Sequence, residues 1–151
     1  GLNLDTDPSA RSVGLPIMPG AVRRIDKDSD NEGSGINFSA WAGVFGLKIV
    51  VLQLPTPESS TRVADYYRRE LARYGEVIDC SANASNPGPK KAARDKDGNK
   101  LSLDCSSDGR SSSGGEYVFK AGTPKNVRLV NVEPKSGQTN INLVRIVANT
   151  D

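Results

Sequence analysis

The chain has 151 residues, with 20 basic residues, 18 acidic residues, no His and a formal net charge of +2. This length suits one domain, and the balanced charge predicts neither nucleic acid nor an anionic membrane as a partner. Without His, the chain lacks the side chain most used for acid–base catalysis near neutral pH, and its two Cys cannot complete a tetrahedral zinc site. The composition therefore predicts a protein that is not an enzyme and holds no cofactor.

The amino-terminal part of the chain divides into two segments. Residues 1–12 are polar and show no apolar period, so we expect a flexible lead-in to a single domain over residues 13–151. The sequence starts with Gly1 and shows neither an initiator Met nor a signal-peptide pattern, which predicts a mature or trimmed chain. Whether a membrane anchor lies upstream of Gly1 stays open. Residues 13–22 are apolar but contain Pro16 and Pro19, so we expect an extended edge segment that turns at Pro19 and Gly20.

Alternating carboxylates follow in the acidic loop of residues 26–32. Asp26, Asp28 and Asp30 resemble the start of a calcium loop, in which oxygens at every second position converge on one ion. The rest of the pattern fails, because Asn31 stands where an EF-hand needs Gly and Asn37 where it needs a bidentate Glu. We favour a solvated turn, and keep a small-ligand or calcium-binding loop as the alternative.

Residues 36–42 and 47–54 predict two strands before the helix, or one bent strand, since glycines separate them. Residues 49–52 are apolar at every position. This run predicts a strand in the sheet interior with both faces covered.

A helix is predicted over about residues 57–74. Pro57 suits the first helical position with Thr56 as its cap, although Ser59 and the next two hydroxyl residues compete as caps, and Gly75 suits the position after the helix. At about 100° per residue, five apolar or aromatic residues fall within one arc of the helix that is wide enough to face a core. These residues are Val63, Ala64, Tyr67, Leu71 and Tyr74.

The opposite side of this helix carries Arg62, Tyr66, Arg69 and Arg73. Arg and Tyr are enriched at interface hot spots, so these four residues are a candidate partner-binding surface. The alternative is a solvated face in which the charges pair within the helix. Nucleic acid is not predicted, because one aromatic residue alone interleaves the arginines.

The only two cysteines are predicted to form a disulfide. Cys80 ends a predicted strand over residues 76–80, and Cys105 ends the segment 100–105. A disulfide favours an exported protein, in the periplasm or otherwise outside the cytosol. The alternative is two unrelated buried thiols in a cytosolic domain.

The remaining chain predicts mostly strands. Segments 90–94 and 100–105 flank Asp97 and Gly98, a hairpin signal, and residues 106–115 predict a flexible loop. Strands are expected over residues 117–120, 126–133 and 139–148, the last two joined by a turn with Gly137 at positive φ. The order of strands, one amphipathic helix and a meander predicts an α+β fold with a mostly antiparallel sheet.

Two segments, LPIMPGA at residues 15–21 and VADYYRREL at residues 63–71 followed by Gly75, are similar to a loose class of bacterial exported domains and lipoproteins of unknown function. In that class a P-G-A edge segment precedes a helix of the form V-x-x-[FY]-Y-x-x-x-L-x-x-x-G. The resemblance covers residues 13–80 and implies an envelope location and an α+β fold, with no catalytic residues to carry over. We therefore expect a non-catalytic binding or structural module of the cell envelope, with an unknown protein partner.

Overall fold

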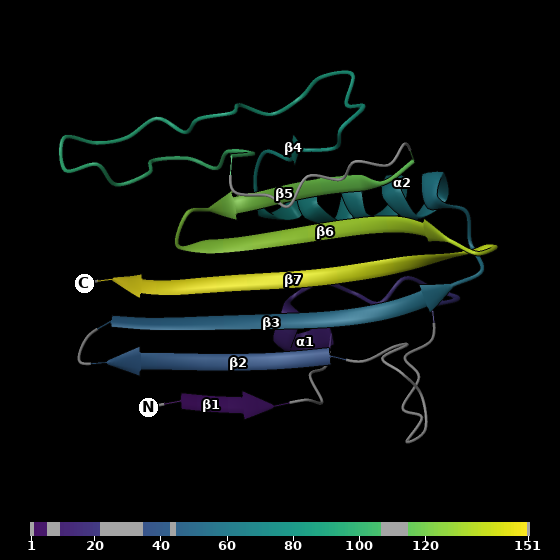
Figure 1. The fold of residues 1–151 in the computed structure, drawn as a ribbon, viewed down its shortest axis with the longest axis horizontal. Coiled ribbons are helices and arrows are strands. Elements are labelled where there is room, and N and C mark those ends of the chain that lie inside the picture. Colours follow the sequence, from purple (N-terminus) through teal and green to yellow (C-terminus); the bar gives the residue numbers. More distant parts are fainter. Residues whose placement is uncertain (1, 6–9, 22–34, 43–44, 107–114, 151) are drawn as a thin grey trace.

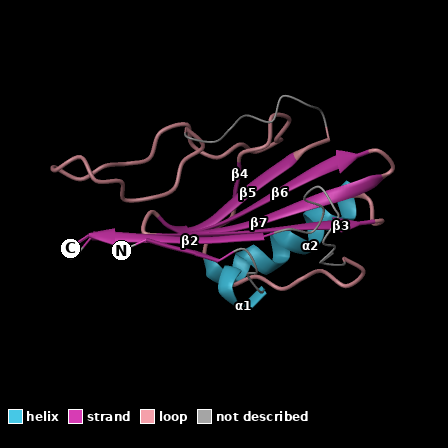
Figure 2. Cartoon of the chain, turned by 60° about the horizontal axis from the view of Figure 1, so that its bottom comes forward, coloured by secondary structure: helices cyan, strands magenta, loops and turns pink. Residues whose placement is uncertain are grey.

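A computed structural model describes residues 2–5, 10–21, 35–42, 45–106 and 115–150. Within these residues the fold is α+β, with a seven-stranded sheet in the order β1-β2-β3-β7-β6-β5-β4 (Figure 1). Neighbouring strands are antiparallel throughout. The two α-helices, α1 and α2, lie on the same side of this sheet (Figure 2).

The strands follow the apolar segments of the sequence. Their bounds in spatial order are β1 Leu2–Asp5, β2 Gly35–Ala42, β3 Phe45–Thr56, β7 Gln138–Thr150, β6 Asn126–Lys135, β5 Tyr117–Thr123 and β4 Ile78–Asp79. The strands predicted over residues 36–42, 47–54, 117–120, 126–133 and 139–148 are thus present, and β2 and β3 are two strands rather than one bent strand. The predicted strand over 76–80 is shorter than expected. β3 and β7 pair along the whole of β3, which joins the middle of the chain to its end.

Helix α2 spans Ser60–Leu71, so it starts three residues after the predicted residue 57, and the competing cap Ser59 is the one used. The strand before it runs on to Thr56, whose hydroxyl accepts a hydrogen bond from Glu58 N at 3.2 Å. Ser59 is the N-cap, and its Oγ accepts from Arg62 N at 3.3 Å. After α2, the 3₁₀ turn η1, Ala72–Tyr74, ends at Gly75, where φ is 130°.

The core lies between the helices and one face of the sheet. Four residues of α2 are buried, namely Val63, Ala64, Tyr67 and Leu71. They face a layer of buried strand residues: Val50, Leu52, Leu54, Phe119, Ala121, Val130, Val132, Ile141 and Leu143. Tyr74 was expected in the same stripe but is 38% exposed. It lies in η1, where the tighter 3₁₀ winding turns side chains away from the α-helical stripe.

The predicted edge segment at residues 13–22 is wrong, because its described part crosses the helix side of the sheet. Helix α1, Ala10–Val13, lies mostly in the predicted lead-in and ends at the first residue of this segment, and Val13, Leu15 and Met18 are buried in the core. Burying these apolar side chains in the core is more favourable in free energy than leaving them along a solvated sheet edge. The turn at residues 19–20 is confirmed, since Ala21 N donates to Met18 O at 3.0 Å.

Two other segments differ from the sequence-based expectation. Residues 2–5, expected in a lead-in without regular structure, pair with β2 as β1; their Leu-Asn-Leu-Asp alternation is a strand pattern too short to stand out. The hairpin predicted around Asp97 and Gly98 has its turn, but only a single bridge between Arg94 and Lys100. The flanking segments are rich in charge and have few apolar side chains to pack, so no strands form.

Candidate binding surfaces

The outer side of α2 and η1 presents exposed arginines, and two of those predicted to bind a partner are paired with nearby carboxylates. An Nη1 of Arg62 lies 3.5 Å from Glu58 Oε2, and Nε of Arg73 lies 3.5 Å from Glu70 Oε2. Arg69 is exposed and makes no ion pair with another described residue. Exposed pairs of this kind contribute little free energy, so this geometry is the one expected of a solvated helix face.

Tyr66 does not join this face as an exposed aromatic side chain. It is partly buried, and its ring meets that of Tyr67 edge to face with centroids 4.9 Å apart. Burial raises the pKa of Tyr66, and the neighbouring Glu70 adds to the rise. The candidate surface of Arg62, Tyr66, Arg69 and Arg73 therefore presents three arginines beside a half-covered ring.

The alternative calcium loop with Asp26, Asp28 and Asp30 lies outside the described residues. In the part of the chain that is described, no group of three or more His, Cys, Asp or Glu residues could hold a metal ion.

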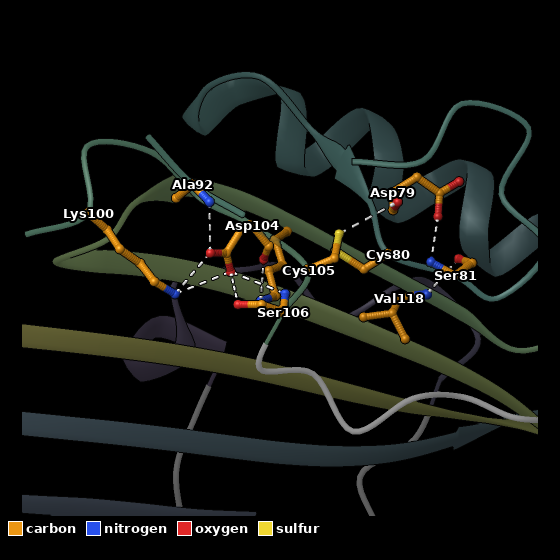
Figure 3. Close-up of a disulfide and its surroundings, with 10 residues drawn as sticks. Asp79, Cys80, Ser81, Ala92, Lys100, Asp104, Cys105, Ser106 and Val118 are labelled. Carbon is orange, nitrogen blue, oxygen red and sulfur yellow. Dashed lines mark hydrogen bonds and ion pairs between the residues drawn. A yellow bond between two sulfur atoms is a disulfide. The ribbon is translucent and has the colours of Figure 1, made fainter. Parts of the chain in front are cut away.

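The predicted disulfide between Cys80 and Cys105 is confirmed, with an S–S distance of 2.03 Å and a Cα–Cα distance of 5.4 Å (Figure 3). Backbone hydrogen bonds fix both cysteines. Cys80 N donates to Val118 O at 2.8 Å, and Cys105 N donates to Pro89 O at 2.8 Å. The disulfide therefore attaches the far end of the excursion 81–106 to the β4–β5 edge of the sheet.

Asp104, which sequence reasoning missed, holds this excursion together (Figure 3). It is 4% exposed, and its carboxylate accepts from Ala92 N at 3.0 Å, Ser106 Oγ at 2.8 Å and Ser106 N at 3.2 Å. Lys100 Nζ lies 3.1 Å from it. Burial alone would raise the pKa of Asp104, but the hydrogen bonds from Ser106, Lys100 and Ala92 outweigh burial and hold the pKa well below its usual value. A carboxylate satisfied by so many donors is a structural anchor.

The face of the sheet opposite the helices is apolar and partly exposed. Its eight aliphatic residues come from β3, β6 and β7: Leu47, Ile49, Val51, Val127, Leu129, Val144, Ile146 and Ala148. We call them the open sheet face. The prediction that residues 49–52 are covered on both sides is wrong, because Val50 and Leu52 are fully buried while Ile49 and Val51 are partly exposed.

A polar row borders the open sheet face. Asn142 Nδ2 donates to Asn131 Oδ1 at 2.7 Å, and Asn131 Nδ2 donates to Glu116 Oε1 at 2.6 Å. Gln53 on β3 is the register partner of Asn142, so the row crosses from β3 to the start of β5. Sequence periodicity could not reveal this row, since its members come together only through strand pairing.

The chain matches no known protein family, and neither curated proteins nor solved structures show a significant match to it. Among the described residues, no helix combines the length and the apolar character that a membrane crossing needs. The class defined by fold and geometry is a disulfide-linked α+β domain whose sheet is packed on one face and partly exposed on the other.

Proposed function

We propose that this protein is a non-catalytic binding module of the bacterial cell envelope, exported to the periplasm or beyond. The disulfide supports export, because disulfides persist in oxidising compartments and are rare in the cytosol. The resemblance of residues 13–80 to exported and lipoprotein-like domains supports the same location. It also supports an α+β fold with an amphipathic helix and a meander of strands.

The observation that carries a binding role is the open sheet face. Eight aliphatic side chains from three adjacent strands are each partly exposed there, whereas Val50, Leu52, Val130 and Leu143 on the helix side are fully buried. Contiguous apolar surface on a small domain marks interaction sites, because moving aliphatic groups out of water lowers the free energy. The partner is a protein with an aliphatic surface of its own, and the row of Asn131, Asn142 and Glu116 supplies polar groups at the rim.

The outer face of α2 is the competing surface, and a pair of charge substitutions separates the two. Val51→Lys places a charge in the middle of the open sheet face, and Arg69→Glu reverses a charge on the outer face of α2. The oxidised wild type and both variants would each be crosslinked to partners in an envelope extract. The captured partner protein would then be purified, and its affinity for each of the three chains would be measured. We expect Val51→Lys to weaken binding about tenfold or more, and Arg69→Glu to leave the affinity unchanged.

Far-UV circular dichroism and melting of each variant establish that the fold is intact. Loss of binding in Arg69→Glu alone would move the site to the helix face. Equal affinity of all three chains would overturn the surface proposed here, and self-association of the wild type lost in Val51→Lys would identify a second copy as the occupant.

A further inference from the structure

Two arginines face each other on the helix side of the sheet, beyond the apolar core. Arg128 on β6 and Arg145 on β7 are direct register partners and both are partly buried. Like charges directly opposite each other on a sheet are destabilising unless something neutralises them. Among the described residues the ion pairs involve other cations, and neither guanidinium meets a carboxylate.

Arg128 is held in place by backbone and ring contacts. Its Nε donates to Gly14 O at 3.1 Å, and its guanidinium carbon lies 3.7 Å from the centroid of the Tyr74 ring. Gly14 makes this approach feasible, because a Cβ at position 14 would lie 2.9 Å from Arg128 Nη2, and φ there is +73°. Burial lowers the pKa of Arg128, and Arg145 lowers it further.

Arg145 is oriented in a similar way by a neutral acceptor. Its Nε donates to Asn126 Oδ1 at 3.3 Å, at the start of β6. Both arginines thus use Nε for anchoring, and no described residue accepts a hydrogen bond from their terminal Nη groups. Side chains fixed in advance lose less conformational entropy when they bind.

We infer that Arg128 and Arg145 form a binding site for a phosphate monoester group, separate from the open sheet face on the other side of the sheet. A dianionic phosphate matches two adjacent positive charges, whereas a single carboxylate would neutralise only one of them. The planar guanidinium fork also suits bidentate hydrogen bonding to phosphate oxygens. An anion between the two side chains removes the repulsion that the register imposes.

The test is calorimetric titration of the oxidised protein with inorganic phosphate and with glycerol phosphate, at constant ionic strength set with chloride. We expect saturable binding of both probes. Arg145→Gln keeps a donor toward Asn126 and should weaken binding about tenfold or more, since a charge-assisted hydrogen bond and one charge are lost. The matched control Arg69→Gln removes one exposed positive charge elsewhere and should bind as the wild type does.

A second variant controls for a change in the fold around α1. Arg128→Lys keeps the charge but loses the fork, and it should also bind phosphate more weakly while melting cooperatively. Vesicles containing phosphatidic acid, which carries the same monoester, distinguish the source: binding to vesicles without binding to glycerol phosphate assigns the site to a lipid headgroup. No saturable binding to any of these probes, or equal loss in Arg69→Gln, would overturn the inference.

Discussion

Tyr67 connects the helix to the segment that crosses beneath it. The side chain is fully buried, and its hydroxyl donates to Pro16 O at 2.9 Å while accepting from Met18 N at 3.0 Å. One hydroxyl therefore satisfies a carbonyl and an amide of a segment that has no strand partner. Burial raises the pKa of Tyr67 far above its usual value, so the hydroxyl stays protonated and keeps its donor role.

Tyr67→Phe should lower the free energy of unfolding by about 1–3 kcal/mol, because a buried amide and carbonyl lose their partner. Urea unfolding followed by fluorescence measures the change. Tyr66→Phe is the matched control and should cost less, since the hydroxyl of Tyr66 bonds to no described residue. Equal costs for the two variants would contradict this account.

Asp104 makes stability depend on pH in the acid range. Its pKa is depressed in the folded state, so the unfolded chain takes up the proton first, near an ordinary value of about 3.9. The contribution of Asp104 is therefore complete above about pH 4 and is lost as the pH falls toward the folded pKa. Unfolding titrations between about pH 2 and 6 should show a shallower dependence for Asp104→Asn than for the wild type. Parallel curves would exclude this role.

At the scale of the element, the start of α2 depends on one hydroxyl. Ser59→Ala removes the acceptor for Arg62 N and should destabilise the protein by about 0.5–2 kcal/mol. Thermal melting monitors the loss. Thr61→Ala, an exposed position inside the helix, should change stability by no more than about 0.5 kcal/mol. A larger effect at Thr61 would place the cap elsewhere.

The elements that sequence patterns predict well are those with a strong local signal. The alternation in β6 and β7 and the apolar stripe of α2 depend on neighbours along the chain, so the α+β class was predictable. The placement of residues 14–21 was not, because Leu15 and Met18 are buried by residues distant in sequence. The open sheet face escaped for the same reason: Ile49 and Val51 look like core residues, and only the positions of α1 and α2 show which face is covered.

The candidate sites were harder to predict than the elements. Arg128 and Arg145 are separated along the chain and meet only because β6 and β7 pair in one register. The cysteines were simpler, since two residues allow a single pairing. The Asp104 cluster had no signal beyond a carboxylate before Cys105, because its backbone and side-chain donors come together only through the path of the loop.

At the scale of the whole molecule, the disulfide restricts the unfolded chain across a sequence separation of 25 residues. Replacing both Cys80 and Cys105 by Ala should lower the free energy of unfolding by about 3.5 kcal/mol, from the loop entropy removed. Guanidinium unfolding of the variant beside the oxidised wild type measures the difference. A change below about 1 kcal/mol would mean that the loop is already ordered without the bond.

The excursion held by this bond also covers the outer edge of the sheet at β4, where a strand of another chain could pair. Beyond Asp79 the outer position is taken by Pro87, and Gly88 N donates to Asp79 O at 2.8 Å. Proline has no N–H to offer an incoming strand, and a two-residue edge is a poor template for pairing. Reduction would remove the covalent link that holds the excursion beside β4. The disulfide thus holds this cover over the outer edge of the sheet, where pairing with a strand of another chain would begin.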